Sequence, residues 1–410
     1  MREYLLTALV AAGVTYLLTG VVRRLASAAG VMTPVRDRDV HAIPTPRLGG
    51  LAMFGGLCAA LLVASQLPLL RSIYEDSTDV QALLSGAALI CLLGLIDDRW
   101  GLDALTKLAG QIVAAGVMVI QGIQIIWLPI PGIVTLSLDP TSGVILTVLT
   151  IVVTINAVNF VDGLDGLASG MVAIGAMAFF GYAYLLAVVH GLERAAAPTL
   201  ATAVLMGICV GFLPHNFHPA RIFMGDSGSM LIGLLLAASS ISLTGQLDPG
   251  AVNSQNLAPA LVPLILPFAI LAVPLMDLML AVVRRTLGGR SPFAADKQHL
   301  HHRLLELGHS HRRAVLIMYF WAGLIAFGTV IVSIIDAPIV VVALTLILVL
   351  FGLIVLNEPR LRSPRRAFAQ RKHPPLPLRA PASEEAPRVP TQAEGSRDQQ
   401  PWSQRSKRAV

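Results

Sequence analysis

The stretch VQALLSGAALICLLGLI, residues 80–96, decides the fold, because it carries no charged side chain and is followed directly by Asp97 and Asp98. A run of this length approaches the ~20 apolar residues with which a helix crosses a bilayer. The whole chain has the same character, since 55% of its 410 residues are hydrophobic, 13% are charged and the mean hydropathy is +0.72. Soluble domains carry roughly a quarter of their residues as charges. The sequence therefore excludes a water-soluble fold and predicts an all-α polytopic membrane protein.

Apolar runs on both sides of residues 80–96 predict about 11 transmembrane helices. The expected spans are residues 4–22, 48–70, 80–96, 104–122, 142–159, 167–189, 197–213, 228–245, 258–283, 314–335 and 337–356. We expect them to form one membrane domain over residues 1–358. Residues 359–410, rich in Pro, Arg, Ser and Gln, predict a disordered basic cytoplasmic tail. A Pro/Gly turn between two β-like runs predicts a small hairpin within residues 124–138.

The positions of Lys and Arg predict how the spans are oriented, because cytoplasmic loops carry an excess of basic residues. If the amino terminus lies outside, nearly all of the 30 Lys and Arg fall on the cytoplasmic side. Only Arg2, Arg71 and Arg194 then remain outside. The sequence therefore predicts an external N-terminus, a cytoplasmic C-terminus and an odd number of spans.

The unusual polar residues fall at the cytoplasmic face. Asp97 and Asp98 end a predicted span, where the negative end of the helix dipole disfavours carboxylates. A salt bridge to Arg99 would stabilise them, and a metal or phosphate site is the other explanation. The loop from Asn156 to Gly170 has two aspartates and no basic residue. Its carboxylate and amide oxygens suit Mg²⁺, which completes its coordination with water and phosphate.

Two later stretches add anion-binding groups. Asp226 and Ser227 lie near a predicted helix amino terminus, where free N–H groups favour anions, although either residue is also an ordinary helix cap. Residues 291–313 contain half of the ten histidines. Zinc binding there is one interpretation, but the spacing fits no usual zinc pattern, and phosphate binding is more economical. Together these stretches predict phosphoryl chemistry on a nucleotide and a lipid.

A transporter is an alternative of a different class, because Asp277 lies within an expected span and intramembrane carboxylates are often functional. Transporter sites usually lie near the bilayer midplane between related halves, whereas the polar residues here are interfacial. No feature indicates a nucleic-acid partner.

The polar motifs share their order with a known family. They are Pro46-Arg-Leu-Gly-Gly50, Gly94-Leu-Ile-Asp-Asp98, residues 102–111, residues 156–170, residues 211–233 and His299-Leu-His-His-Arg303. Over residues 36–313 the chain resembles the polyprenyl-phosphate N-acetylhexosamine-1-phosphate transferases. Its His-Leu-His-His-Arg pattern is similar to the branch that uses UDP-GlcNAc, and within it to the actinobacterial decaprenyl-phosphate enzymes.

The resemblance implies that GlcNAc-1-phosphate is transferred from UDP-GlcNAc to a polyprenyl phosphate, with decaprenyl phosphate expected. The products are UMP and GlcNAc-diphosphoryl-polyprenol, which begins the arabinogalactan linker of the cell wall. A sibling transferase using another UDP-HexNAc is an alternative. The resemblance also implies Mg²⁺, with Mn²⁺ as a substitute, and a multi-pass location in the bacterial inner (plasma) membrane. The active site would lie at the cytoplasmic face, and a homodimer is compatible with the family.

The resemblance further implies roles for individual residues. The catalytic group is Asp97, Asp98 and Lys107, and the metal ligands are Asp226 and Asp98. The substrate-binding residues are Asn156, Asp162, Gly163, Leu164, Asp165, Asn216, Phe223, His299, His301, His302 and Arg303. Asp97 matches the carboxylate assigned as base for the lipid phosphate. Because a phosphate monoester has its second pKa near ~6, positioning of the metal or nucleophile is an alternative role for Asp97.

Overall fold

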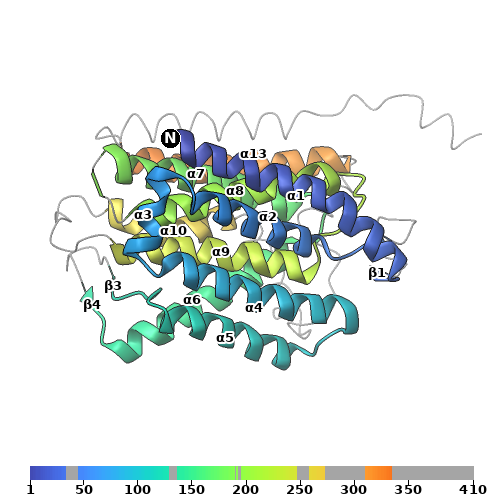
Figure 1. Ribbon diagram of the computed structural model, residues 1–410, viewed down its shortest axis with the longest axis horizontal. Helices are drawn as coiled ribbons and strands as arrows, with labels where there is room; N and C mark the ends of the chain where they lie inside the picture. The colour runs from blue at the N-terminus through green and yellow to red at the C-terminus, as the bar shows by residue number, and fades with distance from the viewer. Residues whose placement is uncertain are drawn as a thin grey trace, which may run out of the picture. The chain divides into compact units, whose positions relative to one another are not determined.

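A computed structural model describes residues 1–33, 45–128, 136–189, 191–192, 195–246, 258–272 and 310–334. Within these ranges the chain is a bundle of α-helices with two short antiparallel strand pairs (Figure 1). The helices are α1 (Arg2–Ala28), α2 (Gly49–Ala64), α3 (Pro68–Asp76), α4 (Asp79–Trp100), α5 (Ala104–Ile120), α6 (Pro140–Val161), α7 (Leu167–Tyr184) with a π-helical extension (Leu185–Val189), α8 (Ala196–Asn216), α9 (Gly225–Gln246), α10 (Ala258–Ile270) and α13 (His311–Ile334). The strands are β1 (Met32–Thr33), β2 (Thr45–Pro46), β3 (Trp127–Leu128) and β4 (Leu136–Ser137).

Among the described residues, seven helices are long and apolar enough to cross a bilayer, or up to eight if α2 and α3 form one bent span. This confirms the prediction of an all-α polytopic membrane protein. The expected span 337–356, the end of span 258–283 and the predicted tail from residue 359 lie outside the described residues. The number of 11 spans therefore stays a prediction.

The expected span 48–70 is not one straight helix. Helices α2 and α3 meet at an angle of 101°. Pro68 is the first residue of α3, and a proline has no N–H with which to continue the hydrogen bonding of a preceding helix. The chain therefore turns at this point instead of extending α2.

Helix α9 is the centre of the bundle. In the apolar stretch of α9 that is long enough to cross a bilayer, 94% of the residues are buried, against 33% in the corresponding stretch of α1. Helix α9 packs against α2, α4, α6, α8 and α10. Small residues allow this packing, because a Cβ added at Gly233 would lie 2.8 Å from the Cα of Ile155 in α6. Such close approach of backbones is typical of helix association in membranes.

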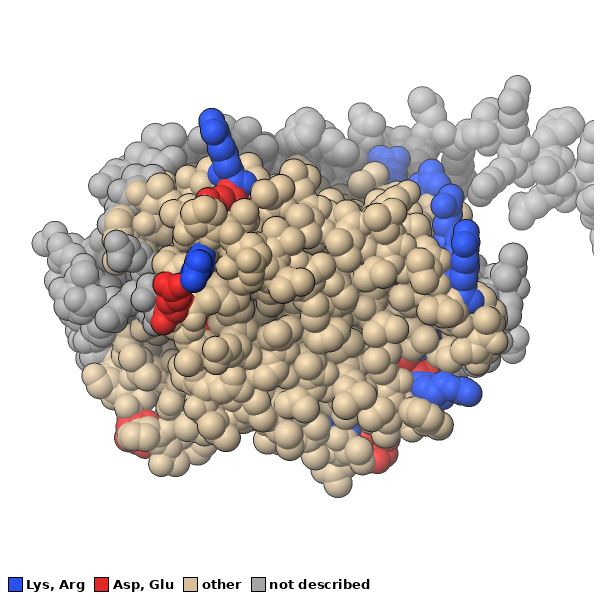
Figure 2. Space-filling view, viewed as in Figure 1, with Lys and Arg blue, Asp and Glu red and all other residues tan. Residues whose placement is uncertain are grey.

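The outer surface suits a lipid environment. Large apolar side chains are exposed along the helices, including Leu9, Leu17, Leu62 and Ile120. On the face shown in Figure 2, charged side chains lie toward the left and right ends, and uncharged residues fill the zone between them. A soluble monomer rarely exposes so much contiguous apolar surface.

The two ends of the bundle differ. At one end β3 and β4 pair antiparallel, with Trp127 opposite Ser137 and Leu128 opposite Leu136, which confirms the predicted hairpin. At the other end the carboxyl termini of α4 and α6 meet the amino termini of α2, α5 and α9, as the contacts below show. The described acidic residues singled out from the sequence lie at this second end, and they are Asp97, Asp98, Asp162, Asp165 and Asp226.

Candidate active site

The amino terminus of α9 is held by a carboxylate from α4. Asp98 Oδ1 accepts a hydrogen bond from the backbone N–H of Asp226 at 2.8 Å. Asp98 Oδ2 accepts from the backbone N–H of Ser227 at 3.1 Å and from its hydroxyl at 2.7 Å. Asp98 thus caps α9 from another helix and meets the positive end of its dipole. This contact explains why a carboxylate is tolerated at the carboxyl end of α4.

Glycines bring these backbones together. A Cβ at Gly94 of α4 would overlap the Cα of Ser227, and a Cβ at Gly50 of α2 would overlap the backbone nitrogen of Gly228. Gly225 has a φ of +73°, and a Cβ there would overlap the carboxylate of Asp98. The glycines of the sequence motifs are therefore required by close helix contact and by a left-handed backbone.

The second carboxylate of α4 belongs to an ion-pair cluster. Lys107 Nζ lies 2.6 Å from Asp97 Oδ2 and 2.6 Å from Asp226 Oδ2. Asp103 caps α5 by accepting from the N–H groups of Leu105 and Thr106, so Lys107 stands in the first turns of that helix. One ammonium between two carboxylates leaves one negative charge uncompensated, which attracts a further cation.

The remaining oxygen of Asp226 is bound by Asn159. The Asn159 Nδ2 group donates to Asp226 Oδ1 and to Ser229 Oγ, each at 2.8 Å. Asn159 lies within the polar stretch from Asn156 to Gly170, and neither the sequence pattern nor the resemblance assigns it a role. Asn156 and Asn159 are three residues apart and therefore lie on one side of α6. This spacing is the sequence signal that could have predicted a site role for Asn159.

Asn156 lies one turn further into the bundle. Its amide donates to Gln111 Oε1 at 2.6 Å and to the carbonyl of Val152 at 2.8 Å. Neither of these hydrogen bonds reaches the acidic cluster, and the predicted role of Asn156 in substrate binding stays a prediction.

Asp162, Gly163 and Leu164 form the turn after α6. Burial raises the pKa of the Asp162 carboxyl well above its usual value. The negative charges of Asp226 and Asp98 add to this rise, and the guanidinium of Arg47 opposes it. Asp162 therefore lies close enough to the cluster to respond to its charge. Leu164 is buried, whereas Gly163 is exposed.

Asp165 and Asn216 join this turn to the connection between α8 and α9. Asp165 Oδ2 accepts from the N–H of Ala220 at 3.1 Å and lies 2.7 Å from His218 Nδ1. Asn216 Oδ1 accepts from Gly166 N–H and Ser169 Oγ, both at 3.1 Å. These contacts give both residues a structural role, and their predicted roles in substrate binding stay predictions.

Phe223 contacts the Pro46–Gly50 motif through its backbone. Its N–H donates to the carbonyl of Pro46 at 2.8 Å, and its carbonyl accepts from Gly49 at 3.1 Å. The adjoining Leu48 has a φ of +97°, a left-handed conformation that non-glycine residues rarely adopt. The motif therefore shapes the entry to α9. The predicted residues His299, His301, His302 and Arg303, and also Asp277, lie outside the described residues.

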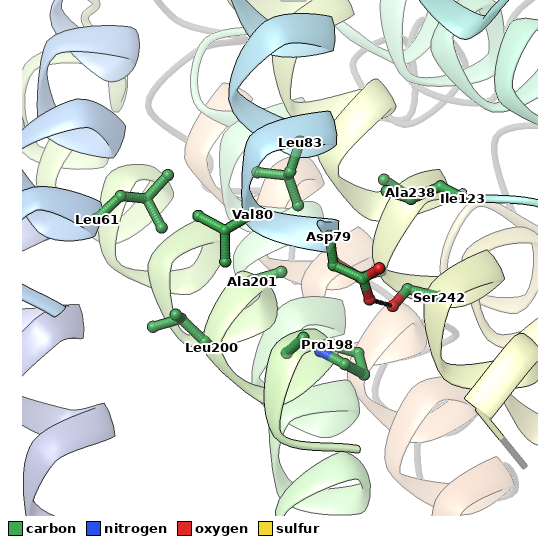
Figure 3. A pocket seen from close by; sticks show the side chains of 12 residues that line it. Leu61, Asp79, Val80, Leu83, Ile123, Pro198, Leu200, Ala201, Ala238 and Ser242 are labelled. Atoms are coloured by element: carbon green, nitrogen blue, oxygen red, sulfur yellow. Dashed lines mark hydrogen bonds between the residues drawn. The ribbon is translucent and has the colours of Figure 1, made fainter. Parts of the chain in front are cut away.

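Figure 3 shows a pocket at the opposite end of the bundle, where Asp79 of α4 accepts a hydrogen bond of 2.5 Å from Ser242 of α9. Its other lining residues include Leu61, Val80 and Leu83 and are mostly apolar. This pocket shares no residue with the acidic cluster. Its one carboxylate, that of Asp79, already accepts the hydrogen bond from Ser242. The Asp97–Lys107–Asp226 cluster is therefore the better candidate for an active site.

Comparisons with known proteins identify what the chain is similar to. The model of glycosyl transferase family 4 matches residues 80–244, a range that includes the whole acidic cluster. The decaprenyl-phosphate N-acetylglucosaminephosphotransferase of Mycobacterium tuberculosis is 49% identical over 331 residues, covering 80% of this chain and 82% of the relative. The protein of the same name from Mycobacterium leprae is 50% identical, with 80% and 83% covered. The undecaprenyl-phosphate alpha-N-acetylglucosaminyl 1-phosphate transferase of Yersinia pestis is 29% identical, with 75% and 78% covered.

Proposed function

The chain belongs to glycosyl transferase family 4, the polyprenyl-phosphate sugar-phosphate transferases, and from this premise we propose that it transfers GlcNAc-1-phosphate from UDP-GlcNAc to a polyprenyl phosphate. The names of its mycobacterial relatives support decaprenyl phosphate as the acceptor and GlcNAc as the sugar. In that setting the product would begin arabinogalactan linker synthesis.

One observation carries the proposal: Asp97, Lys107 and Asp226, from three helices, meet within hydrogen-bond distance at one end of the bundle. A purely structural ion pair needs one carboxylate for one ammonium. Here two carboxylates share it, and the side chains of Lys107 and Asp226 keep exposed fractions of 25% and 29%. An anionic substrate with a counter-cation can therefore reach the cluster.

The reaction exchanges one phosphoanhydride for another. An oxygen of the lipid phosphate attacks the phosphorus that carries the sugar in UDP-GlcNAc. The bond between that phosphorus and the bridging oxygen breaks, and the oxygen leaves with UMP. No water is consumed and no redox partner is needed. The main barrier is the approach of two anions, so charge neutralisation and in-line positioning are the tasks of the protein.

The residues of the cluster fit a divalent cation. The ammonium of Lys107 already occupies a cation position between Asp97 and Asp226, which are the groups that would hold Mg²⁺. When bound, Mg²⁺ supplies charge neutralisation at the transferred phosphate. Both oxygens of Asp98 are engaged by α9. These hydrogen bonds favour a positioning role for Asp98 over the role of metal ligand that the resemblance implies.

Asp97 is held in a fixed position. Its Oδ1 accepts from the N–H of Leu102 at 2.6 Å, and its Oδ2 faces Lys107. Because the lipid phosphate loses its second proton near pH ~6, a base contributes little at neutral pH. We therefore assign Asp97 to positioning of the cation and Lys107.

The remaining features of the proposal concern the membrane. We propose 11 spans with the amino terminus outside, so that the acidic cluster faces the cytoplasm, where a sugar nucleotide is available. We place the protein in the bacterial inner membrane. A homodimer is compatible with this proposal. This orientation is tested by introducing single cysteines near Asp103 and near Asp139 and labelling intact cells with a membrane-impermeant reagent. The Asp139 position should react and the Asp103 position should not. Reaction of the Asp103 position from outside would contradict the orientation.

The function is tested with the full-length protein purified in detergent and supplied with UDP-GlcNAc, Mg²⁺ and decaprenyl phosphate. We expect release of UMP and formation of the lipid-linked diphosphate. A panel of UDP-HexNAc donors and carriers of different length identifies a sibling specificity. Absence of UMP with every donor and carrier, together with substrate uptake by vesicles containing the protein, would favour the transporter instead.

A further inference from the structure

Three side chains of metal-ligating type meet beside the turn that follows α6. Asp165 belongs to that turn, His218 to the connection between α8 and α9, and His311 begins α13. One ligand atom of each lies within 4.8 Å of the other two. His218 Nδ1 is 2.7 Å from Asp165 Oδ2, and the rings of His218 and His311 stack with centroids 4.2 Å apart.

The surrounding contacts hold the three residues in place. Asp165 and His311 are buried, with 5% and 8% of their surface exposed. The N–H of Ala220 donates to Asp165, and Arg312 Nε donates to the carbonyl of His218 at 2.9 Å. Tyr319 of α13 also donates to the carbonyl of Gly166. The segments that supply the three ligands are therefore already joined to one another.

We propose that Asp165, His218 and His311 bind one divalent transition-metal ion of the Zn²⁺ class, at a site separate from the Asp97–Lys107–Asp226 cluster. One carboxylate oxygen and two imidazole nitrogens suit Zn²⁺, whereas Mg²⁺ prefers oxygen ligands. With bonds of ~2.1 Å in a tetrahedral arrangement, two ligands of one zinc ion lie ~3.4 Å apart. The widest of the three separations therefore has to shorten by at most ~1.4 Å, and the 2.7 Å between Asp165 and His218 has to lengthen by ~0.7 Å. The two stacked imidazole rings have to rotate so that their nitrogens face one ion.

Binding requires a change of tautomer at His218. Its hydrogen bond to Asp165 places a proton on Nδ1 of the neutral imidazole, and binding of the metal at Nδ1 moves that proton to Nε2, so that no proton has to be gained or lost. The ion would connect the turn after α6, the α8–α9 connection and the start of α13. Asp97, Lys107 and Asp226 are not ligands of this site, so the inference goes beyond the proposed function. Asp165 is also one of the residues that the resemblance implies for substrate binding, and a bound Zn²⁺ would occupy its Oδ2.

The test uses full-length protein without a polyhistidine tag, in detergent and without substrate. Zn²⁺ affinity is measured by competition with a chromophoric chelator, and Co²⁺ binding by its visible absorption, which reports nitrogen ligands. We expect His311→Gln and His218→Gln each to weaken Zn²⁺ binding by roughly 100-fold, since each removes a ligand. His215→Gln is the matched control, because His215 contacts the carbonyl of Tyr16 and lies outside the three residues. It should leave the affinity unchanged.

Two further variants separate this site from others. Asp226→Asn should retain Zn²⁺ binding even though it disables the proposed transfer, so loss of UMP release and loss of zinc are distinguishable. The triple variant His299→Ala, His301→Ala, His302→Ala should also retain it. Equal zinc affinity in wild type, His311→Gln and His218→Gln would overturn the proposal. So would loss of zinc in the triple variant alone. If a ligand variant unfolds, its thermal transition in metal-free buffer reveals this, and the second ligand variant then decides.

Discussion

Asp98 in the last turn of α4 accepts hydrogen bonds from both the backbone N–H and the hydroxyl of Ser227 in the first turn of α9. The contact joins two helices that the sequence separates by more than a hundred residues. It fixes the start of α9, and thereby places Asp226 beside Lys107. The position of the proposed metal-binding carboxylate therefore depends on a residue that need not touch the metal.

We first predict that Asp98→Ala lowers both stability and activity. The variant leaves the N–H groups of Asp226 and Ser227 without their acceptor, at a cost of about 3 kcal/mol of unfolding free energy. The measurement is the thermal transition in detergent, alongside UMP release. Asp103→Ala, which removes the exposed cap of α5, is the control and should cost less. An unchanged transition with a higher Mg²⁺ requirement would instead make Asp98 a metal ligand.

Asp226→Asn should abolish UMP release at millimolar Mg²⁺ while the protein stays folded. The amide oxygen can still accept from Asn159, but the charge that faces Lys107 and the cation is lost, which reduces turnover at least ~100-fold. Ser229→Ala removes a neutral partner of Asn159 and a hydrogen bond to the carbonyl of Gly225, but no charge, and should retain most activity. Full activity of Asp226→Asn would refute its assignment as a ligand.

For Asp97→Asn we expect a large loss of activity that has the same size at about pH 6.5 and about pH 8.5. If Asp97 positions the cation, ionisation of the lipid phosphate near pH ~6 does not replace it. If Asp97 is the base, the loss should shrink as the pH rises, because the substrate then needs no base. The ratio of wild-type to variant turnover across this range distinguishes the two roles.

Gly94→Ala should disrupt the site by displacing α9. The new Cβ would overlap the Cα of Ser227, and overpacking of this kind costs typically ~1–3 kcal/mol. The matched control is Gly116→Ala in α5, where nothing lies within 4 Å of the added Cβ and alanine improves helix propensity by up to ~1 kcal/mol. Thermal transitions and UMP release of the two variants are compared. Equal behaviour would contradict the close-contact explanation.

Much of this architecture follows from the sequence. The apolar runs predict the described helices. Successive spans run in opposite directions, so the order of the spans along the chain predicts that Asp97, Asn159 and Asp226 lie at the same end of the bundle. The bond between Asp98 and Ser227 was not predictable, because hydrophobic periodicity does not specify which helix ends touch. For the same reason, the sequence does not predict that Asp165, His218 and His311 lie close together. The sequence predicts one continuous span over residues 48–70, because this run is apolar throughout apart from Ser65 and Gln66. Hydrophobicity alone does not show that the helix ends before Pro68.

The last prediction concerns the pH dependence of stability. Burial, together with the charges of Asp226, Asp98 and Asp165, raises the pKa of Asp162 well above its usual value, although the guanidinium of Arg47 opposes the rise. The folded protein then keeps a proton that the unfolded chain releases, so stability falls as the pH rises through the unfolded pKa toward the folded one. In metal-free buffer, Asp162→Asn should therefore raise the thermal transition at neutral pH and leave it nearly unchanged near pH ~2, well below the unperturbed aspartate pKa of ~3.9, where both states are protonated. Asp139→Asn is a control of opposite sign, because hydrogen bonds from the hydroxyl and the N–H of Ser142 lower the pKa of Asp139. A lower transition for Asp162→Asn at neutral pH would show that the folded protein stabilises the charged carboxylate, and would make Asp162 a candidate for binding the cation directly.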